Sequence, residues 1–505
     1  MTVEQHLPGI RLSHKRLVAG MLLVSIAVGM LPVTLAAQQP SSAIAWGSVA
    51  LGAYCSGLLL IAVTAAGHEG LGLASWKIGP WSLAWVAVTF GLVTITWVSP
   101  QSGPAAEITL LSVLRALWLM AVAMTVFTAG YCAGPRKVTE RQVGRLVAEL
   151  GTRFGNDIRG PQVPWLLFAF GSAAQLAFTA TTGRFGYVGD AAAVSTTASG
   201  YSQLLGIAAL CGPLSVTAAA IRAYRMRTAG TRITLTVLFV AEIAIGAASG
   251  GKQSYIVAIL AVLIPRAATR RRLPLAVIVA AILLFLLVII PFNEVYRSNA
   301  RGTVMLSTEQ AVAAAPSIFR QVISTDRSPS VISHSVSYLA QRVSEIDSPA
   351  IILQRTPSQV PYSSPAQLAE APVADLVPRA VWADKPILAT GYQFSQQYFD
   401  LPPDVYTSSA ITPEGDLYRH GGWLPLVAGM FLFGFGIRML DDVLDVRASA
   451  HAAFLVILLF PDFVKSEDDW ITLLAGVPGL IVLWVAVVTL SFARRRLHGP
   501  SPKAM

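Results

Sequence analysis

The residues best suited to chemistry lie together in TPEGDLYRHGGW, the stretch 412–423. Seven consecutive positions hold Glu414, Asp416, Arg419 and His420. Carboxylates and imidazoles exchange protons with reacting groups, and a guanidinium binds phosphate through two parallel hydrogen bonds. The two acids have a second interpretation, because acids also stabilise the N-terminus of a helix. The apolar run LPLVAGMFLFGFGI follows at once, so the stretch joins proton-transfer groups and a cation to the start of a membrane helix.

Further cations precede this stretch. PFNEVYRSNARG contains Arg297 and Arg301, and LVPRAVWADKP contains Arg379, Trp382 and Lys385. Arginine binds phosphate bidentately and lysine acts as a point charge, so the set suits a lipid-linked pyrophosphate at the membrane surface. Each arginine alone is better explained by a headgroup contact or a solvated surface charge, and only the set together favours a function.

A glycine-rich turn and a set of aromatic residues complete the candidates. ASGGKQSY carries Lys252, and its small residues let a ligand approach the backbone. The alternative is a plain turn whose lysine extends to water. The aromatic residues suit sugar faces and the membrane interface equally well. They are Tyr362, Trp382, Tyr392, Tyr398, Tyr406 and Tyr418.

The composition indicates that membrane helices position these groups. Of 505 residues, 54% are hydrophobic and 13% are charged, about half the charge of a soluble protein. An all-α polytopic membrane protein follows, with about twelve apolar runs long enough to span a bilayer. They lie near 17–37, 43–66, 79–99, 108–131, 164–182, 200–221, 233–249, 253–266, 273–292, 421–438, 448–464 and 471–492.

The basic residues predict an orientation. GPRKVTERQVGRLVAELGTRFGNDIRG, RAYRMRTAGTR, RAATRRR and FARRRLHG alternate with loops that carry few cations. Positively charged loops stay in the cytoplasm, so both termini are predicted to lie in the cytoplasm. The membrane that the protein spans is predicted to be the cytoplasmic membrane. This asymmetry accounts for the net charge of +10 without a nucleic-acid partner. The three cysteines have neither disulfide nor metal-ligand spacing.

The chain divides into three parts. Residues 1–292 hold nine predicted spans, and 421–505 hold three more and a cytoplasmic tail. Residues 293–420 are predicted to form a partly helical extracytoplasmic loop domain, because so long a connection is usually functional or disordered. Within the spans, Arg115 and Glu242 have opposite charge and similar predicted depth, which predicts an ion pair, either structural or functional.

The segment 335–436 resembles the Wzy-like O-antigen and exopolysaccharide repeat-unit polymerases. The resemblance lies in QRVSEIDSPAIILQRTP, VPYSS, VPRAVWADKP and TPEGDLYRHGGWLPLVAGMFLFG. SGGKQ is similar to the Gly-Ser-Arg-Gly turn of that family, with Lys252 where arginine is usual. Elsewhere the likeness is mainly one of hydropathy and of the long late loop.

The resemblance implies a metal-independent, GT-C-like glycosyltransferase that elongates glycan on undecaprenyl pyrophosphate, without a cofactor. It implies a chain-length regulator as a partner. Asp416 matches the acid before Leu-Tyr and is the preferred base, with Glu414 and His420 as alternatives. Arg297, Arg301, Arg379, Arg419 and Lys252 would bind pyrophosphate, and Trp382, Lys385 and Tyr418 would hold sugar.

Two other functions stay open. A ligase of the same architecture would transfer finished glycan to another acceptor, which the sequence does not identify. A transporter or flippase of lipid-linked sugars would also have twelve spans. The long loop rich in Arg, Trp and Tyr and the sparse charge within the spans favour it less.

Overall fold

The computed structural model of the protein describes most of the chain. The described residues are 8–68, 71–99, 101, 103–134, 154–182, 184–185, 188–189, 201–270, 275–284, 288–300, 308–324, 343–370, 377, 382, 390–402, 409–447, 449–465 and 467–494.

Helices make up nearly all of the described structure, which confirms the predicted all-α class. Among the described residues, nine helical stretches are long and apolar enough to cross a membrane, and each coincides with a predicted span. They are His14–Ala36, Pro40–Ala65, Ile78–Val98, Leu110–Ala133, Gln162–Thr182, Ser202–Met226, Ala229–Ser249, Trp423–Val443 and Trp470–Ser491.

Several of these stretches contain breaks that the apolar pattern does not reveal. The helices are α1 (Pro8–Gly29), α2 (Leu31–Ala36), α3 (Pro40–Ala65), α4 (Ile78–Val86), η2 (Ala87–Gly91), η3 (Leu92–Val98), α5 (Leu110–Ala133), α7 (Gln162–Thr182), α9 (Ser202–Ala209), α10 (Cys211–Met226), α11 (Ala229–Ser249), α21 (Trp423–Val443) and α23 (Trp470–Ser491). Pro213 has no N–H to donate to the carbonyl of Ala209, so the sixth stretch breaks between α9 and α10.

The other three predicted spans are shorter helices. They are α12 (Lys252–Arg270), α13 (Leu275–Leu284), followed by α14 (Ile290–Ala300), and α22 (Ala450–Lys465). The 16 residues of α22 extend about 24 Å, less than the roughly 30 Å of a bilayer core. The count of twelve spans therefore stays a prediction.

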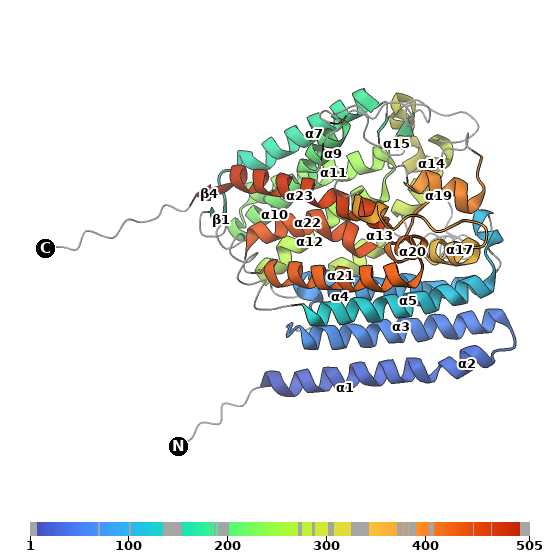
Figure 1. Ribbon diagram of the computed structural model, residues 1–505. Helices are drawn as coiled ribbons and strands as arrows, with labels where there is room; N and C mark the ends of the chain where they lie inside the picture. Colours follow the sequence, from blue (N-terminus) through green and yellow to red (C-terminus); the bar gives the residue numbers. More distant parts are fainter. Residues whose placement is uncertain are drawn as a thin grey trace, which may run out of the picture.

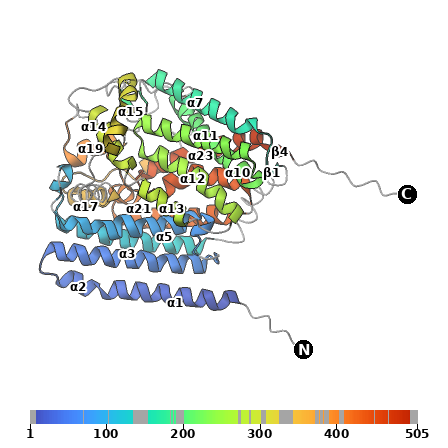
Figure 2. The same ribbon diagram turned by 180° about the vertical axis from the view of Figure 1, so that it is seen from behind.

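The long helices lie nearly parallel in stacked layers (Figure 1). α1 packs on α3, α3 on α5, and α5 along α21, while α10 contacts α7, α11 and α12. Seen from behind, the same order runs from α1 to α7 (Figure 2). One continuous apolar core joins these layers. α1 begins and α23 ends on the side away from α20 (Pro413–Arg419), and we call the two sides the α20 end and the opposite end.

The described parts of 293–420 include helices that pack on the bundle. They are α15 (Thr308–Ser324), α17 (Asp347–Arg355), α19 (Thr390–Phe399) and α20. α17 packs on α5 and α20, and α15 packs on α14 and α11. Residues of α17, α19 and α20 belong to the main core, whereas Phe292, Tyr296 and Ile318 form a small separate one.

Two short antiparallel strand pairs were not predicted. β1 (Phe154–Ile158) pairs with β4 (Phe492–Arg494), with Phe154 opposite Arg494 and Ile158 opposite Phe492. β2 (Arg184–Phe185) pairs with β3 (Val188–Gly189).

A polar lock holds the opposite end of the bundle. Asp441 of α21 accepts hydrogen bonds from the N–H groups of Ile78 and Gly79, at 2.7 and 2.9 Å, and from the Tyr131 hydroxyl at 2.7 Å. Lys77 in turn donates to the carbonyls of Asp441 and Leu444. The lock fixes α4, α5 and α21 to one another.

Candidate functional site

The short helix α20 carries the candidate residues and begins at a side-chain cap. Thr412 Oγ1 accepts a hydrogen bond from the Gly415 N–H at 3.1 Å, and its own N–H donates to Ser348 Oγ of α17 at 3.3 Å. A Cβ at Gly415 would lie 2.9 Å from the Ile352 side chain, so glycine permits the close contact with α17. Capping and close packing together make seven residues a defined helix.

α20 and α21 are separate helices because two glycines lie between them. Gly421 has a φ of +135° and Gly422 a φ of +79°, which favour glycine. Leu417 then packs over Gly429 of α21, where a Cβ would collide with it. One interpretation of the sequence predicted that Glu414 and Asp416 stabilise the N-terminus of the following membrane helix. They lie in α20 instead and do not cap α21.

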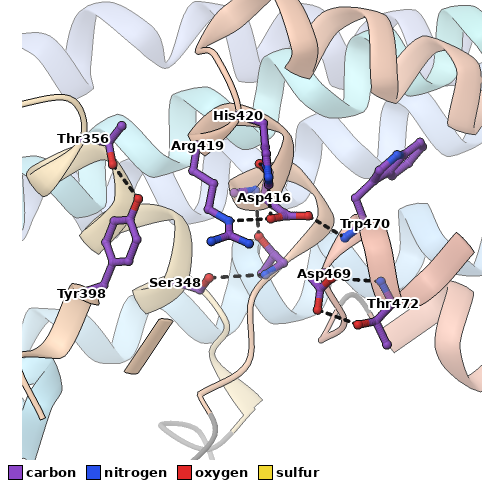
Figure 3. Close-up of polar contacts among 11 residues, drawn as sticks. Ser348, Thr356, Tyr398, Asp416, Arg419, His420, Asp469, Trp470 and Thr472 are labelled. Carbon is purple, nitrogen blue, oxygen red and sulfur yellow. Dashed lines mark hydrogen bonds and ion pairs between the residues drawn. The ribbon is translucent and has the colours of Figure 1, made fainter. Parts of the chain in front are cut away.

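Asp416 lies at the centre of a buried polar cluster (Figure 3). Arg419 Nε donates to Asp416 Oδ1 at 2.5 Å, and the N–H of Trp470 donates to Asp416 Oδ2 at 2.9 Å. Complete burial raises the pKa of the Asp416 carboxyl, and the Arg419 guanidinium opposes that shift. Both oxygens are occupied, so Asp416 joins α20 to the first residue of α23.

His420 is oriented by the same residue. Its Nδ1 lies 2.8 Å from the backbone carbonyl of Asp416 and 3.4 Å from Asp416 Oδ1. A carbonyl oxygen only accepts, so Nδ1 carries the proton and Nε2 of the neutral ring carries the lone pair. No hydrogen bond to Nε2 forms within the described part of the chain. The imidazole is 1% exposed.

A second carboxylate adjoins the cluster at the start of α23. Asp469 accepts hydrogen bonds from the Thr472 N–H at 2.9 Å and from the Thr472 hydroxyl at 2.8 Å. Asp469 lies close enough to Asp416 to oppose its ionisation. The N-terminus of α23 thus faces two carboxylates, which its dipole favours.

The ASGGKQSY turn contacts the segment that precedes Asp469. Lys465 Nζ contacts Asp468 at 2.9 Å and Asp462 at 3.5 Å, and donates to Gln253 Oε1 at 3.0 Å. Gln253 Nε2 donates to Asp462 at 2.7 Å. The start of α12 is therefore tied to the segment between α22 and α23. Sequence reasoning missed these acids, although the run KSEDDW at the end of a span signals them.

α17 is braced by a further arginine that was not predicted. Arg355 contacts Glu107 at 2.9 Å and Asp400 at 2.5 Å. The Thr356 and Tyr398 hydroxyls are hydrogen-bonded at 2.7 Å (Figure 3). These contacts hold α17 and α19 beside α20.

Glu414 lies apart from this cluster, although it is only two residues from Asp416. Its carboxyl is 2% exposed and close to Cys55 of α3, and its Oε2 has no hydrogen-bond partner in the described structure. Burial raises the pKa of Glu414 to about 7, against the opposing effect of hydrogen bonds from its own N–H and from Thr412.

Tyr418 belongs to a third group of residues, which is aromatic. Its ring centroid lies 6.3 Å from that of Tyr362 and 5.6 Å from that of Trp423. Burial raises the pKa of Tyr418 to about 12, aided by Tyr362, while nearby Arg115 lowers it.

The predicted ion pair between Arg115 and Glu242 is not formed in the described structure. The charge of Arg115 acts on Tyr418, whereas the Glu242 carboxylate packs against Gly212 of α10, where a Cβ would collide with it. Similar depth along two helices did not make them neighbours.

Of the remaining predicted site residues, the structure describes some and leaves others out. Trp382 is 42% exposed. Arg297 and Lys252 belong to α14 and α12, but their side chains lie outside what the structure describes. Arg301, Arg379 and Lys385 lie outside the described residues.

Comparison with known proteins gives a family without a described activity. Among the described residues, no group of three His, Cys, Asp or Glu side chains is placed to hold a metal ion. No curated protein and no solved structure matches the chain. The model of one family matches residues 170–442, which run from α7 to α21 and include α20. Because this match covers more than half of the 505 residues, the chain belongs to the family described as Domain of unknown function (DUF8712).

Proposed function

We propose that the chain is a membrane glycosyltransferase that polymerises oligosaccharide repeat units carried on undecaprenyl pyrophosphate. The reaction would take place at the outer face of the cytoplasmic membrane, which the α20 end would face. The resemblance of residues 335–436 to repeat-unit polymerases supports the reaction class. The observation that carries the proposal is the orientation of His420, whose Nδ1 is held by Asp416 while Nε2 has no hydrogen-bond partner among the described residues.

His420 is the base in this proposal. A sugar hydroxyl attacks the anomeric carbon of the donor, and its proton passes to Nε2. The bond from that carbon to the pyrophosphate oxygen breaks, and the bonding electrons leave with the phosphate. Direct displacement inverts the anomeric centre. Asp416 positions the imidazole, because both of its own oxygens are already engaged.

Arg419 supplies positive charge for the departing pyrophosphate. Its Nε is engaged by Asp416, and no hydrogen bond to its terminal nitrogens forms within the described part of the chain. Two parallel N–H groups suit a phosphate. Arg297, Arg301, Arg379 and Lys252 keep their proposed pyrophosphate-binding role.

The reaction requires that an acceptor reaches His420. The imidazole is 1% exposed, so the proposal includes an opening movement next to it. Gly421 and Gly422 adjoin His420 and have the backbone freedom for such a movement.

Reconstituted protein tests the proposal. Liposomes would receive the lipid-pyrophosphate-linked repeat unit with a chelator present, and the products would be separated on a gel. Wild type should give a ladder. His420→Gln should reduce it about 100-fold or more, because that is the usual contribution of a general base. His14→Gln, which changes an exposed histidine of α1, is the matched control.

Two outcomes would contradict a polymerase. Repeat units that cross the bilayer unchanged would indicate a flippase. Units transferred once to an added acceptor, without a ladder, would indicate a ligase. A full ladder from His420→Gln would exclude His420 as the base.

A further inference from the structure

α5 carries a cation on its exposed side. Arg115 stands five residues after Leu110, the first residue of α5, and its side chain is exposed. Leu111, one turn earlier on the same face, is 54% exposed. An exposed leucine on a membrane-crossing helix faces lipid, so Arg115 lies on the lipid-facing side.

Nothing in the described part of the chain neutralises this charge. Arg115 forms no ion pair or hydrogen bond there. At about 1.5 Å per residue, its Cα lies about 8 Å below the start of α5. An unpaired guanidinium at that depth is costly unless it extends to the level of the phosphate headgroups.

Tyr418, which lies within range of the Arg115 charge, belongs to a group of hydrogen-bond donors and aromatic rings. Arg115 acts electrostatically on Tyr418, which interacts in turn with the Tyr362 hydroxyl. Tyr362 is 41% exposed and Trp423 is 49% exposed. Burial raises the pKa of Tyr418 to about 12, so its hydroxyl keeps the proton that a hydrogen-bond donor needs. Tyrosine and tryptophan suit the boundary between lipid and water.

Gly422 lets the Tyr362 hydroxyl approach the backbone closely. A Cβ at Gly422 would lie 3.2 Å from the Tyr362 hydroxyl, and the φ of +79° there disfavours any side chain. Arg115, Tyr362 and Trp423 are therefore exposed on the α20 end, and the buried Tyr418 contacts both aromatic rings within range of the Arg115 charge. Such donors bind the oxygens of a phosphate while the attached lipid chain stays in the bilayer.

We propose that Arg115, with Tyr418, Tyr362 and Trp423, forms a docking site for the phosphate headgroup of a membrane lipid. This docking site rests on the proposed function in one respect, which is the identity of the lipid as the diphosphate-linked donor. Tyr418 and Arg419 are neighbours on α20, so a lipid diphosphate held by Arg115 would lie beside the Asp416 cluster.

The test measures lipid binding, which needs no turnover. The purified full chain would be placed in phosphatidylcholine nanodiscs, and the binding of undecaprenyl diphosphate without a glycan would be titrated. Arg115→Gln should weaken binding about tenfold or more, because hydrogen bonds to charged groups are among the strongest. Arg115→Lys keeps the charge and should lose less, and Tyr418→Phe should weaken binding severalfold. Arg232→Gln, at the start of α11 on the opposite end, is the matched control.

Phosphatidylglycerol as a competitor identifies the source of the phosphate. Equal competition would make this a site for anionic lipids in general. Weak competition would make it selective for the diphosphate, and either result supports lipid-phosphate docking. Unchanged affinity in Arg115→Gln and Tyr418→Phe would overturn it.

The polymerase proposal can fail separately. Docking stands if the wild type binds the diphosphate through Arg115 but makes no ladder. Docking falls if Arg115→Gln makes a ladder with an unchanged KM for the lipid-linked donor.

Discussion

The two carboxyl groups of α20, those of Asp416 and Glu414, have different surroundings. Asp416 has a guanidinium and a backbone N–H within hydrogen-bonding distance. Glu414 is buried near Cys55, and its Oε2 has no hydrogen-bond partner in the described part of the chain. The same short helix thus holds a carboxylate that orients the His420 ring and a carboxyl whose charge the protein disfavours. Titratable groups whose surroundings move their pKa values by several units are frequent at functional sites.

Glu414 should make stability depend on pH. Its pKa rises from 4.5 to about 7 on folding, so the folded state binds the proton more tightly. This contribution is complete below about pH 4.5 and is lost as the pH rises through 7. It amounts to about 3 kcal/mol. The thermal unfolding midpoint of the wild type in detergent should therefore fall between pH 5 and pH 8.

Glu414→Gln should give a shallower fall over the same range. Glu309→Gln, which changes an exposed acid of α15, should keep the slope of the wild type. Equal slopes in all three proteins would show that Glu414 ionises as freely as a surface acid.

Among the elements, the close packing of α5 on α21 sets the position of α20. A Cβ at Gly434 would collide with the backbone carbonyl of Phe127, and one at Gly130 with that of Phe431. These two glycines let the helix backbones touch. The start of α21, and with it the turn that follows His420, is thereby fixed against α5.

Gly434→Ala should destabilise the protein by about 1–3 kcal/mol, because backbone atoms cannot move aside as a flexible side chain can. Gly436→Ala changes the same helix at a position with no neighbour within 4 Å, and should be neutral or slightly stabilising. Thermal unfolding of the two variants makes the comparison. Equal midpoints would mean that α5 and α21 separate without cost.

The sequence predicts the long helices better than their interruptions. Apolar runs placed nine spans within a few residues, because a bilayer imposes one length on every helix. The tenth span was predicted to begin at 421, and α21 begins at Trp423, but the separate short helix α20 before it was not predicted. Residues 412–420 are too polar to belong to an apolar run, and hydropathy does not tell whether such a polar segment is helical.

At the scale of the whole molecule, the two ends of the bundle hold different polar groups. The α20 end holds the Asp416 cluster, the Lys465 cluster and Arg115. The opposite end holds the lock around Asp441, whose carboxylate has three donors. Within the described residues, His420 Nε2 and the Arg115 guanidinium at the α20 end have no hydrogen-bond partner, in contrast to the Asp441 carboxylate at the opposite end.

Cys132 offers a test of which end faces the cytoplasm. It is the exposed cysteine and lies at the opposite end, whereas Cys55 and Cys211 are buried. The predicted orientation places it inside. A membrane-impermeant maleimide should therefore label the wild type in inside-out vesicles and leave right-side-out vesicles unlabelled.

Gln359→Cys in a Cys132→Ser background provides the reverse case, because Gln359 is exposed near α17. It should be labelled in right-side-out vesicles. The opposite labelling of both proteins would invert the predicted topology and would place the proposed site in the cytoplasm.

The sequence identified the local part of the candidate site and missed the distant part. Asp416, Arg419 and His420 are neighbours in the chain, so their spacing indicated a cluster. The N–H of Trp470 bonds to Asp416 from 54 residues away. A backbone donor leaves no trace in the residue type. Arg115 was recognised as unusual but assigned to Glu242, because depth along a helix does not tell which helices are adjacent.

The bond between Asp416 and Trp470 also bears on how the protein is made. Trp470 begins the last long helix, so it leaves the ribosome after α20 and α21. A nascent chain without α23 would have Asp416 and Arg419 but lack the donor to Asp416 Oδ2. The cluster is therefore finished only after α23 has been made, and chains that end before α23 would insert into the membrane without an assembled site.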